Sequence, residues 1–362
     1  MTQQKMLTEI YTSLKPLLII SHLTGVFIFR IDTKSSKIVT SIWNKIAVLT
    51  FYMIYIIGIY PYSKSNLISQ MFFTKTSKAS SFALIYIDHL VTVSSTVWIF
   101  FKRENFFEIL VKLSEIDEIL IDFGVKIDHK KEQRKINFLM ISTMIVQLCL
   151  TVFTIVDKIF NDTRLDLFPI FYSLMIFINA VALVSHFGVL MFNIGIRFKM
   201  MSLCIKQSPQ NCQKMHLKIV ECVKIFNSIY GFPMMIFFAN LFLWCCILAS
   251  LILYVENSDI RMILGTYVSL IMAVLALFMI MYIAEMTLNA KTELVQLLYD
   301  KMSNEPENLM TILPFILQIR HVNVGFSCKF IDFNWHFVFK FITACVMYLT
   351  IIIQLEKSMD KV

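Results

Sequence analysis

Glycine, proline and charged residues are scarce in this sequence, and each shortage excludes a class of protein. The chain has 8 glycines and 7 prolines among 362 residues, and 16% of its residues are charged. Soluble domains are about a quarter charged, whereas 57% of this chain is hydrophobic. We therefore predict a polytopic membrane protein. The shortage of helix breakers favours uninterrupted helices over the broken helices of many transporters.

Motifs for catalysis and metal binding are also missing. The chain contains no Gly-rich phosphate loop, no His-Glu-x-x-His and no Gly-x-Ser-x-Gly sequence, the patterns that mark common enzyme classes. Its 8 cysteines form no Cys-x-x-Cys pair. The spacing of Cys204, Cys212, His216 and Cys222 fits no common zinc site. We expect neither an enzyme nor a bound metal or cofactor.

Seven apolar segments are candidates to cross a bilayer. Crossing a hydrocarbon core of ~30 Å takes about 20 apolar residues in a helix. The last segment, 334–355, has 22 residues. We expect an all-α fold with seven transmembrane helices, of which the first six lie at about 46–62, 79–101, 136–156, 168–192, 232–255 and 262–285.

Lysine and arginine are distributed unevenly between the two predicted sides. With a cytoplasmic N-terminus, the inside segments 1–45, 102–135, 193–231 and 286–333 hold 24 of them, against 8 outside. Cytoplasmic loops carry this excess in membrane proteins. We therefore expect the N-terminus inside and the C-terminus outside, and we read the net charge of +8 as a sign of membrane orientation and not of nucleic-acid binding.

Two further features agree with this orientation. The only Asn-x-Ser/Thr sequon begins at Asn161, in a predicted outside loop, so Asn161 is a candidate glycosylation site. No cysteine falls in a predicted outside segment, where the medium is oxidising. A cytoplasmic N-terminus and the lack of an outside cysteine both disfavour a G-protein-coupled receptor.

The inside segments carry apolar residues at helical spacing. This pattern is present in 102–135, 215–229 and 287–299, and it indicates amphipathic helices. We expect the second, fourth and sixth spans to continue inside as helices that pack on one another or on other subunits. Helices lying on the lipid surface are the alternative, and residues 16–29 are predicted to be an interfacial or partly inserted helix.

The seventh segment carries a semi-polar stripe. Lys340, Thr343, Met347, Thr350 and Gln354 recur at steps of three and four residues, so they share one face of a helix. Such a face suits a water-filled pathway. The stripe alone is more often a sign of hydrogen bonding between neighbouring helices.

Polar side chains also recur at one depth in other spans. Asp88 and His89 in the second span, Gln147 in the third and Asn179 in the fourth lie roughly 14–17 Å from the outer ends. They are candidates for a small-molecule pocket, with Tyr172 a short way above them. A structural hydrogen-bond layer is the equal alternative.

The last predicted span ends in Tyr348, five apolar residues and Gln354-Leu355. This pattern resembles the C-terminal signature of insect gustatory receptors, which is Thr-Tyr, five mostly apolar residues and Gln-Phe. Met347 replaces the threonine and Leu355 the phenylalanine. The preceding stretch 324–335 also resembles the family, and residues 14–27 do so more weakly.

The resemblance implies a function and an assembly. Members are non-selective cation channels of the plasma membrane, gated by small-molecule tastants and expected in sensory dendrites, with no G protein required. Four subunits, identical or different, surround one pore lined by the seventh helix. The resemblance further implies a ligand pocket in the outer half of region 46–285, a cytoplasmic anchor at 286–333 and an outer tail at 356–362.

The alternatives to a gustatory receptor are an odorant receptor of the same superfamily and a non-conducting accessory subunit.

Two sets of candidate site residues follow from these arguments. The predicted ligand-binding residues are Asp88, His89, Gln147, Tyr172 and Asn179, and the predicted pore and gate residues are Thr343, Met347, Thr350, Ile351, Gln354 and Leu355.

Overall fold

The structure is a computed structural model. It describes residues 3–23, 30–32, 37–39, isolated positions between 42 and 60, residues 75–134, 138, 145, 167–205, 208–254, 260–322, 325–328 and 330–359. Long helices dominate these residues. They are α1 (Gln3–Leu23), α4 (Lys75–Phe101), α5 (Arg103–Asp122), α7 (Leu167–Cys204), α8 (Pro209–Tyr254), α9 (Ile260–Asn304), α10 (Leu309–His321) and α11 (Trp335–Met359).

Short elements complete the described chain. Strands β1 (Arg30–Asp32) and β2 (Lys37–Val39) pair antiparallel, with Arg30 opposite Val39. A 3₁₀ turn at Pro306–Asn308 links α9 to α10.

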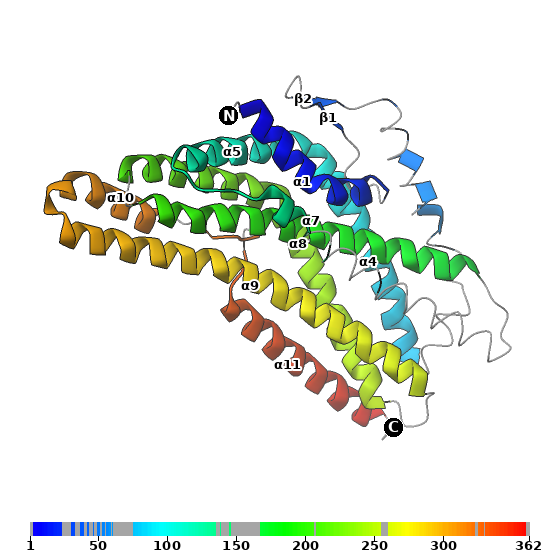
Figure 1. Cartoon of the computed structure of the whole chain (residues 1–362). Helices are drawn as coiled ribbons and strands as arrows, with labels where there is room; N and C mark the ends of the chain where they lie inside the picture. The colour runs from blue at the N-terminus through cyan, green and yellow to red at the C-terminus, as the bar shows by residue number, and fades with distance from the viewer. Residues whose placement is uncertain are drawn as a thin grey trace.

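Helices α8 and α9 are much longer than a membrane is thick. They have 46 and 45 residues, or about 69 and 68 Å at the usual helical rise. A hydrocarbon core spans ~30 Å, so both helices are more than long enough to cross it and extend well beyond it. At one end of the bundle they meet α10, and at the other they lie with the C-terminal end of α11 (Figure 1).

The predicted spans fall within these helices where the structure describes them. Helix α4 contains 79–101, α7 contains 168–192 and α9 contains 262–285. The seventh span, 334–355, lies within α11 apart from its first residue, and α11 continues four residues further, to Met359. Described positions between 46 and 60 are helical, and the third span lies almost wholly outside the described residues.

The inside helices connect differently from the prediction. Helix α7 does continue to Cys204, but the stretch 215–229 belongs to α8, the helix of the fifth span. Helix α8 begins at Pro209, and proline suits the first position of a helix. The second span ends at Phe101, and α5 starts as a separate helix at Arg103.

Helix α1 packs on protein along its apolar face. It begins at Gln3, well before the predicted interfacial segment, and it contacts α5 and α7. Leu7, Ile10 and Leu14 are buried there. The apolar face of α1 is therefore covered by helices of this chain.

Helices α7 and α9 approach closely at a glycine. A Cβ atom added to Gly195 of α7 would lie 2.5 Å from Thr287 Oγ1 of α9. At Gly188, two turns earlier on the same face, the nearest atom, Ile283 Cδ1, is 3.9 Å away. Gly195 thus sets the distance between the two helices.

Candidate functional site

The semi-polar stripe of α11 lies on its exposed side. Lys340, Thr343, Met347, Thr350 and Gln354 are all exposed, and Met347 is 61% exposed. The opposite side packs into the bundle, because Val338 and Phe341 are 2% and 8% exposed. Helix α11 therefore keeps its semi-polar face free for water, lipid or another subunit.

The two threonines of this stripe use their hydroxyl protons within the helix. Thr343 Oγ1 donates to the carbonyl of Phe339 at 2.8 Å, and Thr350 Oγ1 donates to that of Val346 at 2.9 Å. The lone pairs of both oxygens remain available to accept from water or to face a cation. Ile351 is also exposed, whereas the side chain of Leu355 lies outside the description.

Helix α11 packs alongside α8 through aromatic rings at matching steps. The Phe238 and Phe337 rings are 5.2 Å apart, and the Phe242 and Phe341 rings are 5.9 Å apart. The second pair lies one helical turn after the first on both helices, so α8 and α11 run parallel there. Tyr348 continues the contact, 5.9 Å from Phe242.

The segment that leads into α11 is fastened to α8. Asn227 Nδ2 donates to the Gly325 carbonyl at 3.0 Å, and Asn227 Oδ1 accepts from the Ser327 amide at 3.1 Å. Gly231 allows a close approach, because an added Cβ would lie 3.5 Å from Cys328 Cα. A movement of α8 is thereby coupled to the start of α11.

The predicted ligand residues fall into three groups. His89 on α4 and Asn179 on α7 are 5% and 3% exposed, so both point into the protein, and α4 contacts α7. Asp88 and Tyr172 lie on the same two helices, but their side chains are not described. Gln147 lies outside the described residues, as does the sequon at Asn161.

Further buried polar groups lie near His89, and the sequence analysis did not single them out. Thr92 and Ser95 on α4 and Asn240 on α8 are all at least nine-tenths buried. The rings of Trp98 and Phe232, 5.1 Å apart, set the register of α4 against α8. Thr92 and Asn240 are about 9 and 12 Å outward from that contact.

Ser95 has the most unusual environment of this group. Its Oγ is buried, and no hydrogen-bond partner lies among the residues that the structure describes. An unsatisfied buried hydroxyl costs about 1–3 kcal/mol. Such a group can donate a hydrogen bond to a small molecule that reaches this part of α4.

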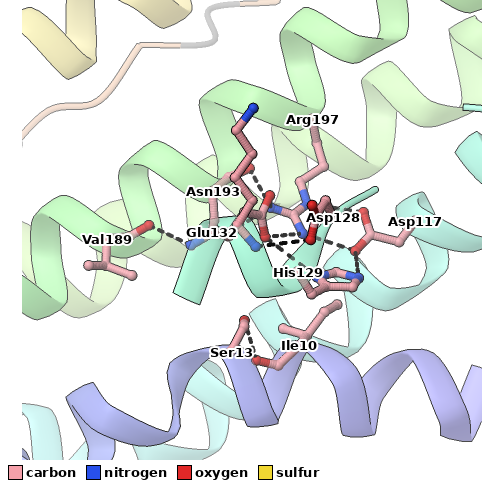
Figure 2. A network of polar contacts seen from close by, with 10 residues as sticks. Ile10, Ser13, Asp117, Asp128, His129, Glu132, Val189, Asn193 and Arg197 are labelled. Atoms are coloured by element: carbon pink, nitrogen blue, oxygen red, sulfur yellow. Dashed lines mark hydrogen bonds and ion pairs between the residues drawn. The ribbon is translucent and has the colours of Figure 1, made fainter. Parts of the chain in front are cut away.

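A second polar cluster surrounds Arg197 of α7, in a predicted inside segment (Figure 2). Its guanidinium binds Asp117 of α5 through two hydrogen bonds of 3.0 Å. It also donates to Glu132 at 3.2 and 3.3 Å and to Asn193 Oδ1 at 2.6 Å. Arg197 is 1% exposed and Asp117 is fully buried. The cluster therefore joins α5, α7 and the segment 128–134 in the interior.

The charges of this cluster depend on one another. Burial disfavours a charged guanidinium, yet Asp117 and Glu132 outweigh burial and raise the pKa of Arg197. Burial likewise opposes ionisation of Glu132, but His129 and Arg197 hold its pKa below the ordinary value. His129 faces both acids, with nitrogen–oxygen distances of 3.7 Å to Asp117 and 3.4 Å to Glu132.

A buried histidine lies where α7, α8 and α10 meet. His216 is fully buried, between the rings of Phe198 and Phe315, and its Nδ1 lies 2.9 Å from Gln318 Nε2. Burial, with a smaller contribution from Lys291, lowers the pKa of His216 to about 4. His216 is therefore neutral near pH 7.

Comparisons with known proteins agree with this architecture. A family model described as 7tm chemosensory receptor matches residues 14–359. The solved structure of the insect olfactory receptor OR5 from Machilis hrabei has a TM-score of 0.74 and 14% identity, covering 96% of this chain and 99% of that chain. Its complex with eugenol has a TM-score of 0.73, with the same identity and coverage. No curated protein matches this chain.

The structural likeness concerns the fold. At 14% identity it establishes the arrangement of the helices and not their ligands. The predicted all-helical, seven-transmembrane fold is confirmed.

Proposed function

The chain belongs to the 7tm chemosensory receptor family, and from this premise we propose that it is a gustatory receptor. It is a ligand-gated channel protein and not an enzyme. In this proposal a small tastant opens a non-selective cation pore in the plasma membrane of a sensory dendrite. The C-terminal sequence from Tyr348 to Leu355, which resembles gustatory receptors, supports taste over smell.

The exposed stripe of α11 carries the channel proposal. Isolated in lipid, Lys340, Gln354 and the threonine oxygens would lose their contacts with water, which costs several kcal/mol for a charged group. Four α11 helices around one axis place these groups along a shared aqueous path. This explains why one face of an otherwise apolar helix is polar and turned away from its own subunit.

An apolar face on α10 supports assembly into a tetramer. Leu309, Met310, Leu313 and Leu317 are 42–88% exposed, and their spacing places them on one side of the helix. They lie in the predicted cytoplasmic anchor, where no lipid covers them. A second copy of this chain or a related receptor would bury this face, giving a homomeric or heteromeric tetramer.

The ligand site is proposed between α4, α7 and α8. His89 on α4 and Asn179 on α7 are buried. From the sequence, Asp88 and Gln147 are assigned to the same layer and Tyr172 to a position a short way above it. We add Ser95, about 9 Å further inward on α4 than His89, because its hydroxyl is buried without a described partner. Since the similar receptor OR5 is solved with eugenol, a small, largely apolar molecule with one or two polar groups suits this chain as well.

Dose-response curves test the ligand site. Receptors carrying Asp88→Asn, Gln147→Leu, Asn179→Leu or Ser95→Ala should need roughly 5- to 150-fold more tastant, because each loses about 1–3 kcal/mol of hydrogen bonding. Ser94→Ala is the matched control, since Ser94 donates to its own helix at Val91 O, 3.3 Å away. Normal responses from all four variants at normal surface levels would place the pocket elsewhere.

Thiol accessibility tests the gate. We propose that Ile351, Gln354 and Leu355 form the narrowest part of the pore near its outer end, where apolar rings close it by dewetting. Single cysteines at these positions, in a background with Cys345→Ser, should react with a charged thiol reagent only when tastant is present. The reaction should block the current, and inertness at all three positions would reject the assignment.

An odorant receptor is the second candidate, favoured by the fold shared with OR5. Panels of tastants and volatiles, applied to cells that express the receptor, separate the two. A protein that reaches the surface but carries no current with either panel would instead be an accessory subunit.

A further inference from the structure

The contact between α8 and α11 continues beyond its aromatic pairs to two cysteines. Phe238 faces Phe337 and Phe242 faces Phe341. One more turn along each helix leads from Phe242 to Cys246 and from Phe341 to Cys345. The same register places Cys246 of α8 opposite Cys345 of α11, where their thiols can interact.

The two thiols differ in exposure. Cys246 is fully buried in α8, whereas Cys345 on α11 is partly exposed, and both are free thiols. Cys345 can therefore meet a small oxidant first, with Cys246 held beside it. Fixed proximity of this kind replaces a bimolecular encounter with an intramolecular step.

We propose that Cys246 and Cys345 form a redox site, at which hydrogen peroxide joins them in a disulfide that ties α11 to α8. Peroxide oxidises the Cys345 thiol to a sulfenic acid and is itself reduced to water. The Cys246 sulfur then attacks the Cys345 sulfur, the S–S bond forms, and a second water leaves. A dithiol reductant reverses the change.

The disulfide has a consequence for gating, and this part rests on the proposed channel function. Helix α11 carries the pore stripe, and opening a pore requires α11 to move relative to the helices that surround it. A covalent bond in the middle of the contact holds α11 in the position seen here. Peroxide is therefore expected to abolish most of the tastant-evoked current.

The experiment has a chemical and an electrical measurement on the full-length receptor in membranes. After peroxide and alkylation of the remaining thiols, peptide mapping should find the Cys246–Cys345 disulfide in the wild type. The disulfide should persist in Cys245→Ser and be absent from Cys246→Ser and Cys345→Ser. In parallel, peroxide should suppress the current of wild type and Cys245→Ser, with recovery in dithiothreitol, and spare the other two.

The outcomes separate this inference from the channel proposal. If the mapped disulfide joins Cys245 to Cys345, or if no disulfide forms, the redox site is refuted whether or not the protein conducts. If the disulfide forms and a robust tastant-evoked current is unchanged, its control of gating is refuted. If no tastant evokes current before oxidation, the channel proposal fails, and the peptide map still decides whether the cysteine pair reacts.

Discussion

Replacing Arg197 by methionine should unfold the inner part of the bundle. The side chains are similar in length, but methionine cannot pair with Asp117 or Glu132, which Arg197 binds through four hydrogen bonds of 3.0–3.3 Å. Two buried acids would then lie together without a guanidinium. Removing one partner of a buried ion pair typically costs about 3–5 kcal/mol, a large share of the stability of most proteins.

Thermal stability in detergent and the amount of receptor at the cell surface measure this effect. Arg197→Met should lower both clearly, since a loss of even about 1–2 kcal/mol changes cellular abundance several-fold. Lys199→Met is the matched control, because Lys199 is exposed on the same helix. Adding Asp117→Asn and Glu132→Gln to Arg197→Met should restore part of the stability. If Arg197→Met alone is as stable as Lys199→Met, the role assigned to the cluster is refuted.

Four further predictions concern other parts of the molecule. The pKa of His216 is about 4 in the folded protein against 6.5 ordinarily, so the unfolded chain takes up a proton first as the pH falls below 6.5. Stability should therefore drop by about 2 kcal/mol between roughly pH 7.5 and 5, and His216→Asn should show a smaller drop in melting temperature over that range. Gly195→Ala should lower the melting temperature by forcing α7 from α9 at a cost of about 1–3 kcal/mol, while Gly188→Ala, with 3.9 Å of room, should not. Asn227→Leu should leave binding of labelled tastant intact but reduce the maximal current, because the start of α11 is released from α8; equal loss of both would contradict the coupling. An epitope after the C-terminus should stain on intact cells and one before the N-terminus only after permeabilisation, and the reverse would overturn the orientation.

Features that depend on local periodicity could be predicted from the sequence. The stripe from Lys340 to Gln354 was expected on one face because helical spacing alone places it there, and the structure leaves that face exposed. Asn179 was expected to turn inward because polar groups are costly in lipid, and it is buried. Both predictions require only the helical repeat and the apolar surroundings of a membrane span, and no knowledge of a specific partner residue.

Features that depend on a specific partner could not be predicted. Arg197 was counted with the other basic residues of its segment, although it is buried and its partner Asp117 is 80 residues away in sequence. One signal was present: Asp117 lies on the apolar face of α5, between Leu113 and Leu120, where a lone acid needs a buried partner. Asn227 carried no such signal, because its partners lie in a loop about 100 residues later.

The charge at Gln354 tests most directly whether α11 lines a cation pore. Reversal potentials and amplitudes of the tastant-evoked current would be compared for wild type, Gln354→Glu, Gln354→Lys and the neutral control Gln354→Leu at matched surface levels. A ring of four glutamates should attract cations and raise the permeability to calcium relative to sodium, whereas four lysines should suppress the cation current. If all four receptors conduct with the same amplitude and reversal potential, Gln354 does not face the ion path and the account of α11 is wrong.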